Sequence, residues 1–120
     1  MQDQRDEILA AIDADHGVTA VSMGWLRELY DSEWGRLSTG RAAEISRWLA
    51  KHEVAHLPSP LPSREADEVV LYRPASPVGV YISAARLEGP FEHRPGAAAY
   101  FLQVVAKSLN GTERAETDRD

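Results

Sequence analysis

The 120-residue sequence contains no cysteine, and it has no unbroken apolar stretch close to the 18 or more residues of a membrane span. The absence of cysteine excludes a disulfide framework, a thiolate metal site and a cysteine nucleophile. The absence of a long apolar run predicts that no helix crosses a membrane. The first fifteen residues are acidic and lack the basic and then apolar pattern of a signal peptide, so we expect a cytoplasmic protein.

Sequence motifs for several enzyme classes are also missing. There is no glycine-rich phosphate loop and no GxSxG motif, so neither a nucleotide-dependent enzyme nor a serine hydrolase is indicated. Hydrophobic residues make up 43% of the chain and charged residues 27%, which is the ordinary globular mixture. We therefore expect a folded domain of ordinary size.

Positive charge is scarce overall, because 13 Lys and Arg stand against 19 Asp and Glu and give a net charge of −6. The charge is unevenly distributed, at −6 for residues 1–34, +3 for 35–64 and −3 for 65–120. The middle third is thus the only basic region, and an anionic partner would have to bind there.

The first half of the chain predicts three helices and one short strand. Residues 3–14 have the apolar spacing of a helix that Asp3 or Asp6 can cap and Gly17 can end, and residues 18–21 favour a strand that pairs with a later one. Ser22 can cap a second helix that ends near residue 32. Ser38 or Thr39 can cap a third helix that runs to about residue 53.

The second half predicts a hairpin and two further helices. Residues 54–57 and 68–72 favour two antiparallel strands, because prolines prevent a helix between them. Residues 77–85 suit either a helix or a strand, and we favour a helix because Ser76 and Pro77 form a capping pair. The expected organisation follows from these elements: residues 1–86 form the main domain with a short following helix, 87–96 a linker loop, 97–111 a C-terminal helix and 112–120 a disordered tail.

This order of elements resembles that of a winged helix-turn-helix domain over residues 4–73. It is also similar to small uncharacterised bacterial winged-helix-like proteins with an HLPxxLP-like hairpin and a strand ending in LYR, for which His56–Pro62 and Leu71–Arg73 are the matching residues. The resemblance implies an α+β, mainly helical fold with a winged helix-turn-helix core, a two-strand wing and an added C-terminal helix. It further implies that the third helix enters the DNA major groove while the wing contacts the backbone or the minor groove.

Carried over to this sequence, the resemblance implies DNA contacts from the third helix, the turn before it and the wing. The candidate residues are Arg36, Ser38, Thr39, Arg41, Arg47, Lys51 and Arg64. Glu44 lies among them and departs from a basic recognition surface, because a carboxylate can accept a hydrogen bond from cytosine but repels phosphate. Basic residues on a helix also serve solubility alone, so a winged-helix module that binds only proteins is the first alternative.

His52, Glu53 and His56 form an HExxH motif, which on a helix places two imidazoles for zinc and a carboxylate for its bound water. This pattern looks like the signature of zincin metallopeptidases and gives the second alternative, a small zinc peptidase. Pro58 and Pro60 predict that the helix stops at or before His56, so that His56 lies on a strand. His52 shares a face with apolar residues of the third helix and is expected to be partly buried. The third ligand would come from His93, Glu65, Asp67, Glu68 or Glu92.

The sequence as a whole therefore favours a DNA-binding regulatory protein without a cofactor or a catalytic residue. Its expected partner is double-stranded DNA, with a protein partner as the alternative. The C-terminal helix is apolar nearly all round, which predicts packing on two sides and a homodimer through this helix.

Overall fold

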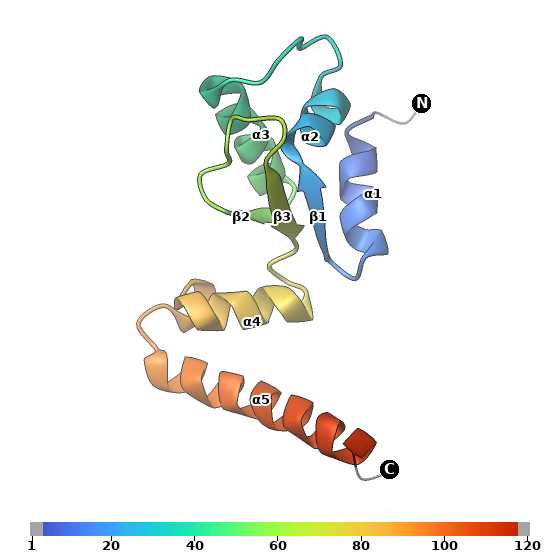
Figure 1. Cartoon of the computed structure of the whole chain (residues 1–120). Coiled ribbons are helices and arrows are strands. Elements are labelled where there is room, and N and C mark those ends of the chain that lie inside the picture. Colours follow the sequence, from blue (N-terminus) through green and yellow to red (C-terminus); the bar gives the residue numbers. More distant parts are fainter. Residues whose placement is uncertain (1–3, 118–120) are drawn as a thin grey trace. The chain divides into compact units, whose positions relative to one another are not determined.

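The structure is a computed structural model that describes the backbone of residues 4–117 (Figure 1). Its class is α+β and mainly helical, with one three-stranded antiparallel sheet. The elements are α1 (Asp6–Ala14), β1 (Val18–Ser22), α2 (Met23–Tyr30), α3 (Thr39–Lys51), β2 (Ala55–Leu57), β3 (Glu68–Tyr72), α4 (Pro77–Arg86), the 3-10 turn η1 (Gly89–Phe91) and α5 (Pro95–Thr117). None of the described helices is long and apolar enough to cross a membrane.

Serine side chains begin α2 and α3, as the sequence predicts. Ser22 Oγ accepts a hydrogen bond from the N–H of Trp25, and Ser38 Oγ accepts one from the N–H of Arg41. These bonds satisfy backbone donors that have no partner inside the helix.

The expectation for the start of α1 is corrected. Asp6 is the first residue of the helix, where its charge suits the helix dipole, and the capping position belongs to Arg5, which makes no side-chain cap. Asp3 lies outside the described residues. Gly17 does end this region: its φ is +91°, and its N–H donates to the carbonyl of Ile12.

The sheet has the order β1-β3-β2, with both neighbouring pairs antiparallel. β1 therefore pairs with a later strand, and β2 and β3 form the expected hairpin. Residues 58–67 connect β2 to β3, and we call this segment the wing loop.

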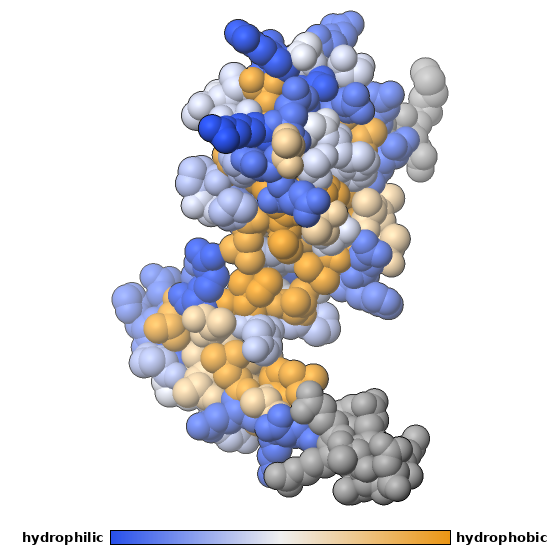
Figure 2. Space-filling model, viewed as in Figure 1, coloured by the Kyte–Doolittle hydropathy of each residue, from blue (hydrophilic) through white to orange (hydrophobic). Residues whose placement is uncertain are grey.

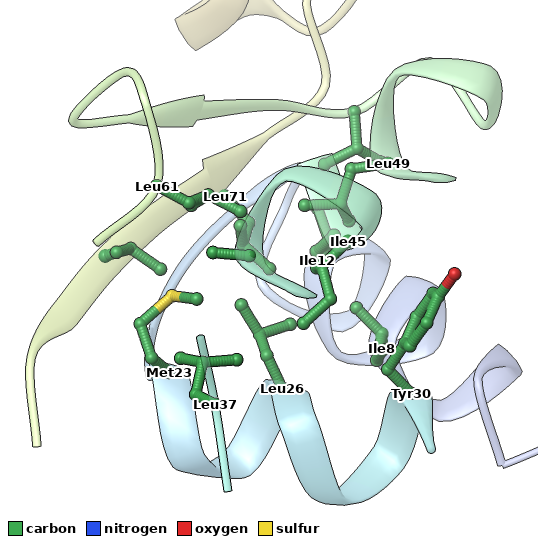
Figure 3. Packing of buried hydrophobic residues seen from close by; sticks show 13 residues of the cluster. Ile8, Ile12, Met23, Leu26, Tyr30, Leu37, Ile45, Leu49, Leu61 and Leu71 are labelled. Carbon is green, nitrogen blue, oxygen red and sulfur yellow. The ribbon is translucent and has the colours of Figure 1, made fainter. Parts of the chain in front are cut away.

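Apolar side chains from three helices and the sheet form one core (Figure 3). Ile8 and Ile12 extend from α1 toward Leu26 of α2 and Ile45 of α3, and all four are fully buried. Leu71 of β3 completes this layer from the sheet side. The periodicity of α1–α3 thus fixes which face of α3 is buried and which is left outside.

The chain divides into two compact units, Met1–Gly79 and Val80–Asp120. The division falls inside α4. Residues 77–86 are helical, in agreement with the favoured alternative. The expected linker of residues 87–96 contains η1 and the first two residues of α5.

α5 differs from its expected bounds at both ends. It begins at Pro95, because proline suits the first turn of a helix, and it continues past Gly111 to Thr117. One glycine costs a helix only about 1 kcal/mol, so it does not end α5, and residues 112–117 are helical where we expected disorder. Residues 118–120 lie outside the described part. Apolar side chains remain at the surface of α5 (Figure 2), with Val104 50% and Leu109 60% exposed.

Candidate nucleic-acid interface

The outward face of α3 is built mostly from small residues and cations. Ala42, Ile45 and Leu49 are buried and define the inner face of the helix. At 100° per residue, the opposite face is formed by six residues that are all exposed. They are Gly40, Ala43, Glu44, Arg47, Ala50 and Lys51. This face combines three small residues with two positive charges and one negative charge.

Two of the expected contact residues hold the start of α3 in place. Ser38 Oγ is engaged as the N-cap. Arg41 donates from Nη1 to the carbonyl of Arg36 over 2.6 Å, and its guanidinium lies 4.9 Å from the centre of the Trp34 ring. Their interactions stabilise the turn between α2 and α3, which leaves Arg41 less free to reach a ligand.

The other expected residues are exposed around α3 and the wing loop. Arg36 and Thr39 lie at the N-terminal end of α3, Arg47 and Lys51 on its outward face, and Arg64 in the wing loop. Among residues 4–110, no acidic side chain forms an ion pair with any of these four cations. Their charge is therefore available to an anionic ligand.

Glu44, the acidic residue on this face, is held by Tyr30 of α2. The Tyr30 hydroxyl donates to Glu44 Oε2 over 2.8 Å. Burial raises the pKa of Tyr30, and its hydrogen bond to Glu44 raises this pKa further, while the nearby charge of Arg5 opposes both effects. At neutral pH the hydroxyl thus keeps its proton and directs the carboxylate of Glu44 toward α2.

Three arginines outside the expected set have structural contacts that sequence reasoning missed. Arg5 stacks on the Tyr30 ring at 3.9 Å and donates to the Tyr30 carbonyl. Arg27 bonds to the Trp34 carbonyl and to Glu65. Arg73 binds Asp13 through two nitrogens and also the carbonyl of His52. Apart from Trp34, these partners lie 21 or more residues away in the sequence, so no local spacing signals them.

The HExxH motif does not lie on one helix. His52 is the C-cap of α3, Glu53 has a φ of +60°, and His56 lies on β2. The His52 ring lies 4.6 Å from that of Trp48, but His52 is exposed and not partly buried as expected, because the helix ends before it.

His56 has other partners for both of its ring nitrogens. Nδ1 lies 2.8 Å from the carbonyl of Pro58, to which it must donate, and Nε2 lies 2.7 Å from Ser46 Oγ. No group of three or more possible metal ligands gathers among the residues that the structure describes. The geometry therefore contradicts the helical zinc motif of the peptidase alternative and gives His56 the role of joining β2 and the wing loop to α3.

Comparison with protein-family models, curated proteins and solved structures found no match for the chain.

Proposed function

We propose that this chain binds double-stranded DNA as a winged-helix protein, with α3 in the major groove and the wing loop beside the phosphate backbone. The observation that carries the proposal is the set of exposed cations without an acidic partner among the described residues. They are Arg36, Arg47, Lys51 and Arg64. All four belong to α3, its preceding turn or the wing loop, the segments that this docking geometry brings to DNA.

The arrangement of elements supports the proposal. The order α1, β1, α2, α3, β2, β3 and the sheet order β1-β3-β2 agree with a winged helix. Packing of α2 and α3 on the sheet leaves the outward face of α3 uncovered by the first unit. With its side chains an α-helix is about 10–12 Å in diameter, so an exposed helix such as α3 fits a major groove about 12 Å wide.

The small residues on α3 also suit close approach to bases. A Cβ atom built on Gly40 would meet nothing within 4 Å, and Ala43 and Ala50 project only a methyl group. Alanine can contact the methyl group of thymine, whereas Arg47 can donate to guanine. The face thus has groups for reading bases as well as for binding phosphate.

The binding strength should be modest and sensitive to salt. One copy has about four available cations, so the slope of log K against log salt should be about −3 to −4. The remaining acidic surface, part of a net charge of −6, disfavours unspecific binding to DNA.

Anisotropy of labelled duplex DNA tests the proposal. The double variant Arg47→Glu/Lys51→Glu should weaken binding at low salt by roughly tenfold or more, because two phosphate contacts become repulsive. Arg94→Glu reverses one charge, where the α3 variant reverses two, at an exposed position in the second unit and should bind nearly as wild type. Circular dichroism would establish that both variants are folded.

A flat anisotropy signal for wild type at low salt would rule the proposal out, as would equal losses in the α3 variant and in Arg94→Glu. A module that binds a protein partner would then be the better candidate. The exposed apolar side chains Val104 and Leu109 of α5 favour that second function.

A further inference from the structure

The outer edge of β1 can be assigned from the hydrogen bonds at its two ends. The N–H of Arg73 donates to the carbonyl of Gly17, and the N–H of Met23 donates to the carbonyl of Asp67. Both pairs continue the register of β1 and β3. In an antiparallel ladder, every second residue directs its backbone groups at the partner strand. The residues whose backbone N–H and C=O face away from β3 are therefore Val18, Ala20 and Ser22.

These outward groups have few partners within the chain. The Val18 N–H reaches the carbonyl of Asp15 at 3.4 Å. Within residues 4–110, the Ala20 N–H, the Ala20 carbonyl and the Ser22 N–H have no hydrogen bond to a side chain or to a backbone group outside the sheet. They form an open row of donors and acceptors.

β1 also lacks the features that usually protect an edge strand. The segment Val18–Ser22 has no charged residue and no proline, and its pairing with β3 has no bulge. Ala20, at its centre, is exposed and small. The other edge is different, because β2 has only three residues and is followed by Pro58 and Pro60.

We propose that β1 pairs with β1 of a second copy across a two-fold axis and joins the two sheets. With Ala20 opposite the partner's Ala20, each N–H of this pair donates to the other's carbonyl. The Ser22 N–H then donates to the carbonyl of the partner's Val18, and the symmetry repeats this bond. Four main-chain hydrogen bonds form without any change of register within either copy.

The second copy fits this edge for two reasons. The row of donors and acceptors is complementary to itself, because Val18 and Ser22 lie equally far from Ala20. The strand is uncharged, so two chains that each have a net charge of −6 can meet here without placing like charges in the contact.

A contact built on one five-residue strand is small compared with a stable interface of about 1,600 Å². The dimer should therefore be weak and should form at high protein concentration. Because it involves neither α3 nor the wing loop, its test needs no DNA and is independent of the proposed DNA binding.

Crosslinking is sensitive here because the wild-type chain has no cysteine. Residues that form a hydrogen-bonded antiparallel pair have Cα atoms about 5.5 Å apart, within the range that a disulfide spans. Oxidised Ala20→Cys should give a covalent dimer, while Ala43→Cys, which is exposed on α3, should stay largely monomeric. Equal crosslinking of the two variants, or none in Ala20→Cys, would overturn the proposal.

Sedimentation equilibrium of two further variants tests the hydrogen bonds themselves. Ala20→Pro removes an N–H that β3 does not use, so the fold should survive while the dimer weakens at least tenfold. Ala20→Val keeps the N–H and should dimerise as wild type. A dimer that tolerates Ala20→Pro but is lost in Val104→Glu would assign the contact to α5 instead, and a wild-type chain that stays monomeric at about 1 mM would also refute the β1 contact.

Discussion

The basic side chains of the first unit fall into two groups that differ in what they contact. Arg5, Arg27 and Arg73 join segments far apart in sequence through hydrogen bonds to carbonyls and carboxylates. Arg47 and Lys51 point away from the core and have no ion pair among the described residues. Basic side chains of the first group thus stabilise the fold, whereas those of the second group remain available to an anionic ligand.

The first group makes particular use of the ends of helices. Arg5 donates to the carbonyl of Tyr30, the last residue of α2, and Arg73 donates to the carbonyl of His52, the C-cap of α3. Carbonyls at a helix C-terminus lack partners within the helix and favour positive charge. Arginine suits these sites because one planar group can serve several acceptors, which lysine does less well. Two of the three arginines in the first group therefore bind the carbonyl end of a helix.

Arg73→Ala should have the largest effect on stability, because Arg73 makes three side-chain hydrogen bonds within the fold. It removes a charged hydrogen bond to the His52 carbonyl and leaves Asp13 without its partner. The loss of the carbonyl bond alone should lower the free energy of unfolding by about 2 kcal/mol, measured by urea denaturation. Arg47→Ala is the control and should change stability by less than about 0.5 kcal/mol. If both variants lose a similar free energy of unfolding, the two groups of basic side chains do not differ in their contribution to stability.

Tyr30→Phe should have a smaller effect, because it keeps the ring contacts to Trp34 and Trp48 and removes only the hydrogen bond to Glu44. We expect a loss of about 1 kcal/mol in the free energy of unfolding near pH 7. Since the folded state raises the pKa of Tyr30, the unfolded chain loses this proton first as pH rises. The advantage of tyrosine should therefore shrink above about pH 10, as measured by urea denaturation of both proteins. A difference that stays constant or grows in alkali would contradict this assignment.

Local pattern predicts the elements well but not the contacts between them. Ser22 and Ser38 were predictable as caps, since an N-cap depends only on the residues beside it. The pairing of Arg73 with Asp13 spans 60 residues and depends on how β3 passes α1. The periodicity of apolar residues in either element does not predict that Arg73 and Asp13 lie close together.

The candidate site illustrates the same limit. The outward positions of Arg47 and Lys51 follow from helical periodicity. The engagement of Arg41 by Trp34 and of Glu44 by Tyr30 does not, because each requires the packed turn between α2 and α3. The HExxH spacing misleads for a related reason, since α3 ends at Lys51, before the motif begins.

Asp13→Asn should have the smallest effect on stability. It tests how much of the contribution of Arg73 comes from its acidic partner. The hydrogen bond from Arg73 lowers the pKa of Asp13, against a smaller opposing effect of desolvation, and the charge of Arg73 lowers it further. The folded chain thus keeps this carboxylate ionised at a pH where the unfolded chain takes up a proton. The stabilisation is present at neutral pH and is lost as pH falls below about 5 and through the lowered pKa.

Thermal melting of wild type and Asp13→Asn between pH 7 and pH 3 measures this effect. The difference in melting temperature should be small at pH 7 and should shrink toward pH 3. Arg73→Met supplies the control, because in that background Asp13→Asn should cause no pH-dependent difference. If the difference persists unchanged in acid, or if it survives in the Arg73→Met background, Asp13 stabilises the fold by some contact other than its ion pair with Arg73.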